Sequence, residues 1–227
     1  AQLAGSVGAL TEDWNGFAVL HTAASRVGGL DLGFVPGEGG LDTAGMVAAA
    51  GSGTLDVLFL LGADEIDTRA LGEAFVVYIG SHGDAGAHRA DVILPGAVYA
   101  EKSGTWVNTE GRVQVGLRAG FPPGEAREDW AILRALSGVL GTTLPFDSLA
   151  QLRARLYAEL PHMAREGEIV PAAADLSALA AVGGTMDGAA FVSPVKDFYL
   201  TNPIARASAI MAECSALARG QVKAAAE

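Results

Sequence analysis

The chain has 227 residues, of which 50 % are apolar and 18 % are charged; this excludes a disordered protein and allows one sizeable α/β core. Its formal net charge of -11 argues against nucleic acid and anionic lipid surfaces as partners. The single cysteine, Cys214, excludes a disulfide framework and a cysteine-held iron–sulfur cluster built from this chain alone.

Membrane insertion is not expected, although the mean hydropathy is +0.31. The densest apolar stretch, 57–61, stops at Gly62, whereas a bilayer span needs roughly 20 apolar residues. No signal peptide or lipidation motif opens the chain. Because it begins with Ala1 rather than methionine, we expect a processed or shortened chain.

The N-terminal part is predicted to hold two helices separated by a glycine-rich loop. Apolar residues at helical spacing favour a helix over 13–27, which the glycine pair at 28–29 would end. A loop over 30–40 and a short alanine-rich helix over 43–50 would follow.

Three apolar runs, 56–62, 74–80 and 91–95, predict buried strands. Uninterrupted apolar runs suit parallel strands that are covered on both faces. A short helix at 68–73 and a loop at 81–90 would connect them. The alternation of strands and helices predicts an α/β fold, with a layered, Rossmann-like parallel sheet flanked by helices.

After the third strand the pattern changes to extended chain and then to helices. Residues 101–114 predict an extended segment with a turn around 109–111, and 122–124 a linker. Acidic Glu128 and Asp129 open one helix, and Asp147 or Ser148 caps the next.

The C-terminal part is predicted to be loosely structured and to end in a helix. Residues 171–188 are small and weakly patterned, so we expect a domain at 1–170 and a tail at 171–227. Asn202 as cap and Pro203 at the first helical position predict one final helix. Its apolar side would carry Ile204, Met211, Cys214 and Leu217. This helix either docks on a partner or folds back on the domain.

The loop after the second strand offers a candidate metal site. His82, Asp84 and His88 lie within a few residues of one another, at the strand end where open α/β sheets bind ligands. Their spacing fits no common ligand motif, so we favour a turn and short helix that link two strands.

Three carboxylates, Asp64, Glu65 and Asp67, follow the first strand. They could bind a cation or ligand hydroxyls at the strand exit. Acidic residues also suit the N-terminus of a following helix, and we favour this capping role.

Other features are interpreted as structural. The glycine-rich segment 28–40 lacks the lysine of a phosphate-binding loop, and Asp31 and Glu38 would repel phosphate. No G-x-S-x-G motif supports serine hydrolysis. Cys214 is expected to be a buried, inert thiol.

The runs 90–95, 101–105 and 108–114 together resemble a signature of the molybdopterin oxidoreductase superfamily. Glycines in it allow backbone geometry that a side chain would block, and Asn108 and Arg112 can satisfy carbonyls and carboxylates around the turn. The signature positions are Asp91, Pro95, Glu101, Gly104, Thr105, Asn108, Glu110, Gly111 and Arg112.

Longer motifs at 60–67, 78–88, 122–130 and 193–208 are similar to the large iron–sulfur (75-kDa-type) subunit of respiratory complex I, the NADH:quinone oxidoreductase. The similarity extends over about residues 8–219. It implies that iron–sulfur clusters lie in an N-terminal part of the parent subunit, and that this chain is a molybdoenzyme-like domain without its cofactor.

The resemblance also implies the setting. The parent complex would oxidise NADH and reduce quinone, and this chain would contact the rest of its own subunit and neighbouring peripheral-arm subunits. Its position would be peripheral, on the cytoplasmic side of the bacterial inner membrane.

We therefore expect a non-catalytic structural and assembly domain without catalytic, cofactor-binding or metal residues. The alternative is a pterin-dinucleotide or nucleotide-binding module of a molybdopterin oxidoreductase-type enzyme. A free-standing interaction protein is a third interpretation.

Overall fold

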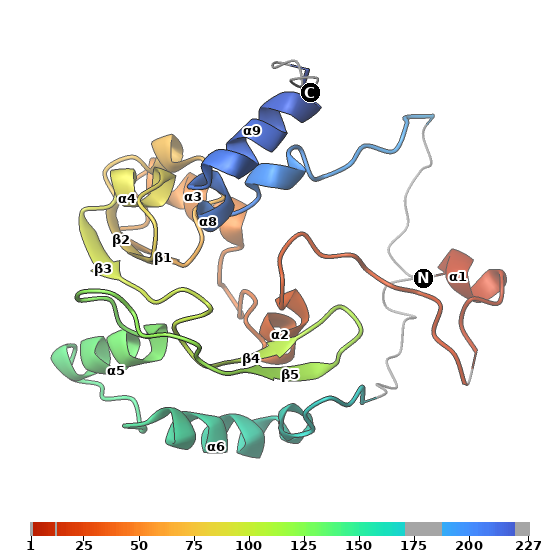
Figure 1. Ribbon diagram of the computed structural model, residues 1–227, viewed down its shortest axis with the longest axis horizontal. Helices are drawn as coiled ribbons and strands as arrows, with labels where there is room; N and C mark the ends of the chain where they lie inside the picture. Colours follow the sequence, from red (N-terminus) through yellow and green to blue (C-terminus); the bar gives the residue numbers. More distant parts are fainter. Residues whose placement is uncertain (1, 12, 171–187, 221–227) are drawn as a thin grey trace, which may run out of the picture. The chain divides into compact units, whose positions relative to one another are not determined.

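The structure is a computed structural model that describes residues 2–11, 13–170 and 188–220 (Figure 1). The chain divides into two compact units. The first unit comprises Ala1–Phe34, Thr105–Val115 and Tyr157–Pro194, and the second comprises Val35–Gly104, Gly116–Leu156 and Val195–Glu227. The predicted domain boundary lies at residue 170, next to residues 171–187, which are outside the described residues. The predicted irregular segment, 171–188, is therefore also outside them except for Gly188. The division into 1–170 and 171–227 therefore stays a prediction.

A three-stranded parallel sheet, in the order β1-β2-β3, forms the centre of the second unit and confirms the α/β fold. The strands are β1 (Val57–Leu61), β2 (Phe75–Gly80) and β3 (Val92–Pro95). Three short helices connect or precede them: α3 (Thr43–Gly51), the 3-10 helix η1 (Thr68–Leu71) and α4 (Ala85–Arg89). The predicted strands, the helix before them and the short helix in the loop after β2 are thus all confirmed.

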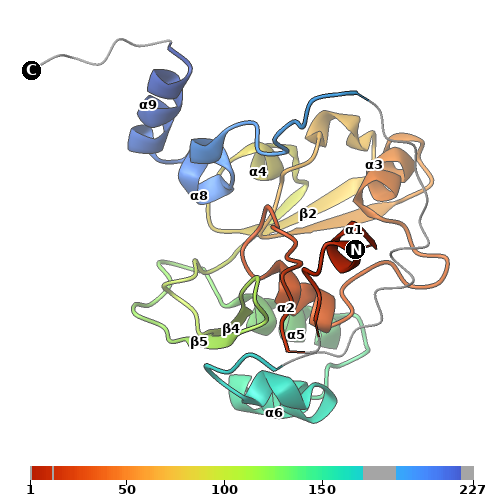
Figure 2. The same cartoon turned by 90° about the vertical axis from the view of Figure 1, so that its right-hand side faces the viewer.

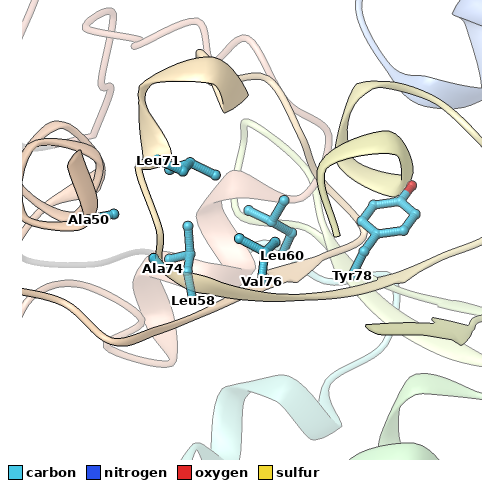
Figure 3. Close-up of a cluster of buried hydrophobic side chains, with 7 residues drawn as sticks. All are labelled: Ala50, Leu58, Leu60, Leu71, Ala74, Val76 and Tyr78. Carbon is cyan, nitrogen blue, oxygen red and sulfur yellow. The ribbon is translucent and has the colours of Figure 1, made fainter. Parts of the chain in front are cut away.

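The hydrophobic core lies between one face of the sheet and these helices (Figure 3). Side chains at alternate positions of β1 and β2 point to this face, because successive strand residues point to opposite faces. They meet Ala50 of α3 and Leu71 of η1, which are both fully buried. The remaining members of the cluster are Leu58, Leu60, Ala74, Val76 and Tyr78.

The opposite face of the sheet is apolar and, along β1 and the start of β2, nearly half exposed. Val57, Phe59, Leu61 and Phe75 lie on it and are between 45 % and 47 % exposed. We call these four side chains the apolar face. The prediction that the strands are covered on both faces is wrong for β1 and for Phe75 at the start of β2, but it holds for Val77 and Ile79, which point to the same side and are buried.

The extended segment forms a β-hairpin of β4 (Gly104–Val107) and β5 (Val113–Gly116), as the turn prediction expected. Two helices follow, α5 (Asp129–Val139) and α6 (Leu149–Glu159), and then the 3-10 helix η2 (Pro161–Ala164). Ser148 caps α6, since its hydroxyl accepts the N–H of Gln151 at 3.2 Å.

The single C-terminal helix that was predicted is two helices. A 3-10 helix, η3 (Phe198–Leu200), precedes α8 (Pro203–Arg206) and α9 (Ala209–Ala218). Asn202 and Pro203 begin α8 as expected, but Ser208 begins α9, because its side chain accepts the N–H of Met211. Asp197 then fixes η3 to α9 through the hydroxyl of Ser215 at 2.6 Å.

One side chain of the tail differs from expectation. Cys214 is partly exposed rather than buried. Of the two alternatives for the tail, the structure shows it folded back on the second unit through α8, whose Arg206 pairs with Asp64 and Asp84, while Ile210 of α9 remains 68 % exposed.

The helix predicted over 13–27 is absent from its described residues, apart from its last two positions. Helices are found instead at α1 (Gln2–Ser6) and α2 (Arg26–Asp31), and α2 contains both glycines that were expected to end a helix. Asn15 accepts the N–H of Phe17 at 2.9 Å, a local turn that competes with helix formation. Trp14 is 60 % exposed, so the apolar spacing meets no core that would hold a helix in place.

No helix in the described ranges combines the length and the apolar character that a bilayer crossing requires.

Leu71→Ala should destabilise the chain by about 2–5 kcal/mol, because it leaves a cavity at a fully buried position of the core. Leu117→Ala is the control; Leu117 is 77 % exposed, and its loss should change stability by less than about 0.5 kcal/mol. Urea unfolding followed by circular dichroism measures both, and equal effects would contradict the placement of the core.

Candidate functional site

The carboxyl ends of the strands are where an open α/β sheet binds its ligands. β1 leads into Asp64 and Glu65, and the segment after β2 leads into Asp84. Ion pairs with one common arginine bring these three carboxylates together. Sequence analysis identified acidic residues at this edge but missed their partner.

That partner is Arg206, the last residue of α8. Its Nε donates to Oδ2 of Asp84, and its Nη2 donates to Oδ1 of Asp64. Its Nη1 lies 3.4 Å from Oε1 of Glu65. The side chain of Asp64 is 0 % exposed, so the guanidinium provides the opposite charge that a buried carboxylate needs.

The local sequence of α8 sets the position of this arginine. The side-chain oxygen of Asn202 accepts the N–H of Ala205 at 2.9 Å, and Pro203 is buried at the first helical position. One turn later Arg206 ends the helix, where a cation also suits the helix dipole. Figure 2 draws α8 beside α4, whose N-terminus carries Asp84.

Gly86 allows the buried carboxylate to reach α4. The second oxygen of Asp64 accepts the N–H of Gly86 at 2.8 Å. A Cβ at Gly86 would lie 2.8 Å from Cβ of Asp64 and 2.9 Å from the ring of Tyr78, which is too close for any side chain. Asp64 therefore caps the helix after β2, rather than the next helix in the sequence.

The surroundings of Arg206 and of the carboxylates that it contacts favour their charged forms. The hydrogen bond from Arg206 is the main cause that lowers the pKa of the Asp84 carboxyl below its ordinary value of 3.8. Burial lowers the pKa of Arg206, but hydrogen bonding to Asp84 and nearby carboxylates outweigh it and raise that pKa. Burial also raises the pKa of Tyr78, whose hydroxyl donates to the carbonyl of His82 at 3.2 Å. Asp84 and Arg206 stay charged at neutral pH, which suits a structural ion pair better than a proton-transfer site.

The metal hypothesis receives no geometric support. Asp84 is held by Arg206 and by the N–H of Ala85, while the ring of His82 lies 2.9 Å from the hydroxyl of Ser81. In the part of the chain that the structure describes, no group of three or more His, Cys, Asp or Glu is arranged to hold a metal ion. The preferred interpretation, a turn and a short helix, is what the structure contains.

The hypothesis that the carboxylates after β1 cap the next helix in the sequence holds for only one of the three. Asp67 begins η1, and its side chain accepts the N–H of Arg69. Asp64 and Glu65 pair with Arg206 instead, which is far away in the sequence and could not be identified from local spacing.

The first signature residues hold the end of the sheet. Asp91 accepts the N–H of Val76 at 2.7 Å, and this bond is the main cause that lowers the pKa of its carboxyl. The carbonyl of Pro95 accepts the N–H of Arg127 at 3.0 Å. Glu101 accepts the N–H of Val98 at 3.1 Å, closing the next turn.

The remaining signature residues form the hairpin. Gly104 opens β4 without a positive φ and Thr105 continues it, whereas Gly111 has a φ of 86°, which disfavours any other residue. Asn108 contributes an acceptor, since its side-chain oxygen accepts the N–H groups of Glu110 and Arg112. Its Nδ2 also donates to Oε2 of Glu110 at 3.4 Å, so the expectation that Asn108 satisfies a carboxylate around the turn holds, but among the described residues it satisfies no carbonyl. Arg112 does satisfy one, donating to the carbonyl of Gly167 at 2.5 Å, and it also lies 3.9 Å from Glu110.

An open hollow of about 300 Å³ lies beside this hairpin, within the first unit. Its polar lining includes His21, Arg26, Asn108 and Gln114. Ser25 borders it with a φ of 57° and accepts the N–H of Val107 at 3.0 Å. Sequence analysis missed this hollow, because nothing in the spacing of 21–26 links that segment to the hairpin.

The model of the family "Molybdopterin oxidoreductase" matches residues 1–139, more than half of the chain. The chain belongs to the molybdopterin oxidoreductase family. A second family model, which describes the C-terminal region of an NADH-ubiquinone oxidoreductase subunit, matches residues 168–214. The two matches together confirm the resemblance inferred from the sequence motifs.

Curated proteins that resemble the chain point to the same resemblance. The mitochondrial 78 kDa subunit of NADH-ubiquinone oxidoreductase from Candida albicans is 44 % identical over 210 residues, covering 89 % of this chain and 28 % of the relative. The 75 kDa subunit from Reclinomonas americana is 43 % identical over 207 residues, covering 91 % and 29 %. The mitochondrial NADH dehydrogenase (ubiquinone) iron-sulfur protein 1 from Solanum tuberosum is 42 % identical over 207 residues, covering 90 % and 27 %. This member of the molybdopterin oxidoreductase family thus spans little more than a quarter of the length of these relatives.

Arg206→Ala should destabilise the chain by about 3–5 kcal/mol, because it leaves Asp64 buried without a compensating charge. Arg206→Lys should recover part of this loss, since an ammonium restores the charge but cannot contact several carboxylates in a planar fork. Arg69→Ala, in an exposed pair with Asp67, is the matched control and should have little effect. Equal urea midpoints for the two alanine variants would contradict the role assigned to Arg206.

Asp84→Asn should flatten the acid limb of the stability profile. The pKa of Asp84 is lower in the folded chain, so its stabilisation is complete above the unfolded pKa and is lost as pH falls through the folded pKa. Unfolding free energies measured between about pH 7 and about pH 3 should therefore fall less in the variant than in the parent. Glu38→Gln, at an exposed loop carboxylate, should leave the slope unchanged; identical slopes for parent and Asp84→Asn would count against the assignment.

Proposed function

We propose that the chain is a non-catalytic structural domain of the large iron–sulfur subunit of an NADH:quinone oxidoreductase. The observation that carries this proposal is the occupation of the ligand edge of the sheet by Arg206. An edge that is filled by a charged side chain of the same polypeptide has its polar groups already paired. A ligand would have to break those pairs before it could bind.

The single cysteine supports the same proposal. One thiol cannot hold an iron–sulfur cluster by itself, so the clusters that an iron–sulfur subunit carries would lie elsewhere in the parent polypeptide. The relatives leave room for them, because more than two thirds of each relative lies outside the matched stretch. The chain itself is proposed to bind neither metal nor pterin.

The proposed partners are the rest of the same subunit and neighbouring subunits of the peripheral arm. The proposed position is peripheral, on the cytoplasmic side of a bacterial inner membrane, at a complex that transfers electrons from NADH to quinone. Relatives that are named as subunits of NADH-ubiquinone oxidoreductase support the proposed partners, whereas the bacterial position rests on the resemblance of the sequence motifs alone.

One observation favours the alternative, a nucleotide or pterin-dinucleotide module. The hollow beside the hairpin is at the lower end of the volume of small-molecule sites and contains a cation, Arg26, together with amide side chains. It lies beside residues of the molybdopterin oxidoreductase signature, including Asn108.

Purified chain should contain only traces of iron and molybdenum by plasma mass spectrometry, and should not oxidise NADH. Guanosine di- and triphosphates should leave its melting temperature unchanged. Iron or molybdenum in a stoichiometric amount would contradict the structural proposal. A saturable, micromolar thermal shift that Arg26→Ala abolishes would favour the nucleotide-binding module.

In the assembled complex, Arg206→Ala should reduce the amount of complex but not the NADH:quinone turnover of each complex that forms. The physical reason is that the substitution weakens folding of the domain without touching a redox centre. Native gels give the amount, and activity normalised to the flavin content gives the turnover. A lower turnover per complex, with normal assembly, would point to a catalytic or electron-transfer role instead.

A further inference from the structure

Parallel sheets bury both of their faces, because crossover helices normally cover them. The sheet of the second unit departs from this rule on part of one side, because Val77 and Ile79 of β2 are buried there while their neighbours on β1 are not. Its inner face packs on α3 and η1, whereas Val57, Phe59, Leu61 and Phe75 stay nearly half exposed on the other. All four side chains are large and apolar, and contiguous apolar patches of a few hundred Å² are often functional.

These residues are contiguous. Val57 pairs with Phe75 across β1 and β2. Phe59 and Leu61 follow Val57 at two-residue intervals on the same face of β1. Among the described residues β1 hydrogen-bonds only to β2, so the apolar face also reaches an open sheet edge.

We propose that the apolar face is covered by a helical layer from polypeptide of the same subunit that lies outside these 227 residues. This inference rests on the proposed function, and it names the surface and the occupant that the assembly role requires. Two observations select this occupant. The first is length, since the chain spans only 27–29 % of its relatives, so each relative has ample further chain to supply the layer.

The second is area. Aromatic side chains present about 150–250 Å² each and branched aliphatic ones somewhat less, so four that are nearly half exposed leave on the order of 300 Å². A two-fold dimer through this face alone would bury on the order of 600 Å², well below the roughly 1,200–2,000 Å² of stable interfaces. A layer on the same polypeptide needs less area, because the covalent connection provides a high effective concentration.

The test uses the complete subunit in its assembled complex, with p-benzoylphenylalanine in place of Phe59 at the centre of the apolar face. This replacement keeps an aromatic side chain, so folding should be retained. Irradiation followed by peptide mass spectrometry should identify an intramolecular crosslink to a segment of the same polypeptide outside residues 1–227. The control carries the same group at Val139, which is 85 % exposed at the end of α5, and should not give that crosslink.

Every other product would overturn the inference. A crosslink to a second copy indicates a dimer interface, one to a different subunit indicates an intersubunit contact, and one within 1–227 indicates a contact inside the chain. The absence of any crosslink above the control indicates a face that stays in water.

The outcome is separable from the proposed function. Stoichiometric metal or nucleotide binding would defeat the structural proposal while leaving the crosslink unaffected. A crosslink to another polypeptide would defeat the inference while leaving the domain non-catalytic.

Discussion

The ion pair between Arg206 and the buried carboxylate of Asp64 is the interaction on which the architecture of the second unit depends. A carboxylate that is removed from water needs an opposite charge and hydrogen bonds, or it strongly destabilises the fold. Arg206 provides the charge and the N–H of Gly86 provides a further bond, so β1, α4 and α8 are joined at one point. Asp84 joins the same group from the N-terminus of α4, with its pKa lowered by the arginine. Elements that are far apart in the sequence thus share one electrostatic contact.

That contact lies where an α/β sheet normally offers its ligand site, and this position connects the fold to the proposed role. A binding site needs polar groups whose partners are missing until the ligand arrives. Here the guanidinium of Arg206 already contacts three carboxylates, and the side chain that makes the contact belongs to the same chain. Closing the edge in this way gives the tail a fixed anchor and removes the most obvious place for chemistry. The hairpin of the family signature is likewise held by internal bonds, from Asn108 to its own turn and from Arg112 to Gly167.

Local patterns predicted the parts of this structure that local forces determine. The strand at Val57–Leu61 was predictable because five consecutive apolar residues followed by glycine leave few alternatives, and the cap at Asn202 was predictable because Asn before Pro begins helices. The helix expected over 13–27 was wrong, since apolar spacing forms a stable helix only when a core receives it. Asp64 was correctly singled out but wrongly assigned, because its partner lies 142 residues away and no spacing rule connects them. The motifs that carry the family resemblance identified the family without indicating which of their residues meet in space.

The edge of the sheet that Arg206 occupies and the apolar face differ in the free energy that each would gain by being covered, and this difference favours a role in assembly. The charged groups at the edge are already paired, so little is gained by covering them further. The apolar face still has exposed area to bury. Removing an area on the order of 300 Å² from water contributes about 7 kcal/mol of hydrophobic free energy at about 25 cal/mol/Å². That free energy is comparable with the whole stability of many domains, which is about 5–15 kcal/mol. A chain that pairs its own charges at the usual ligand site and leaves an apolar sheet face open therefore has more to gain from contact with protein than from binding a small polar ligand.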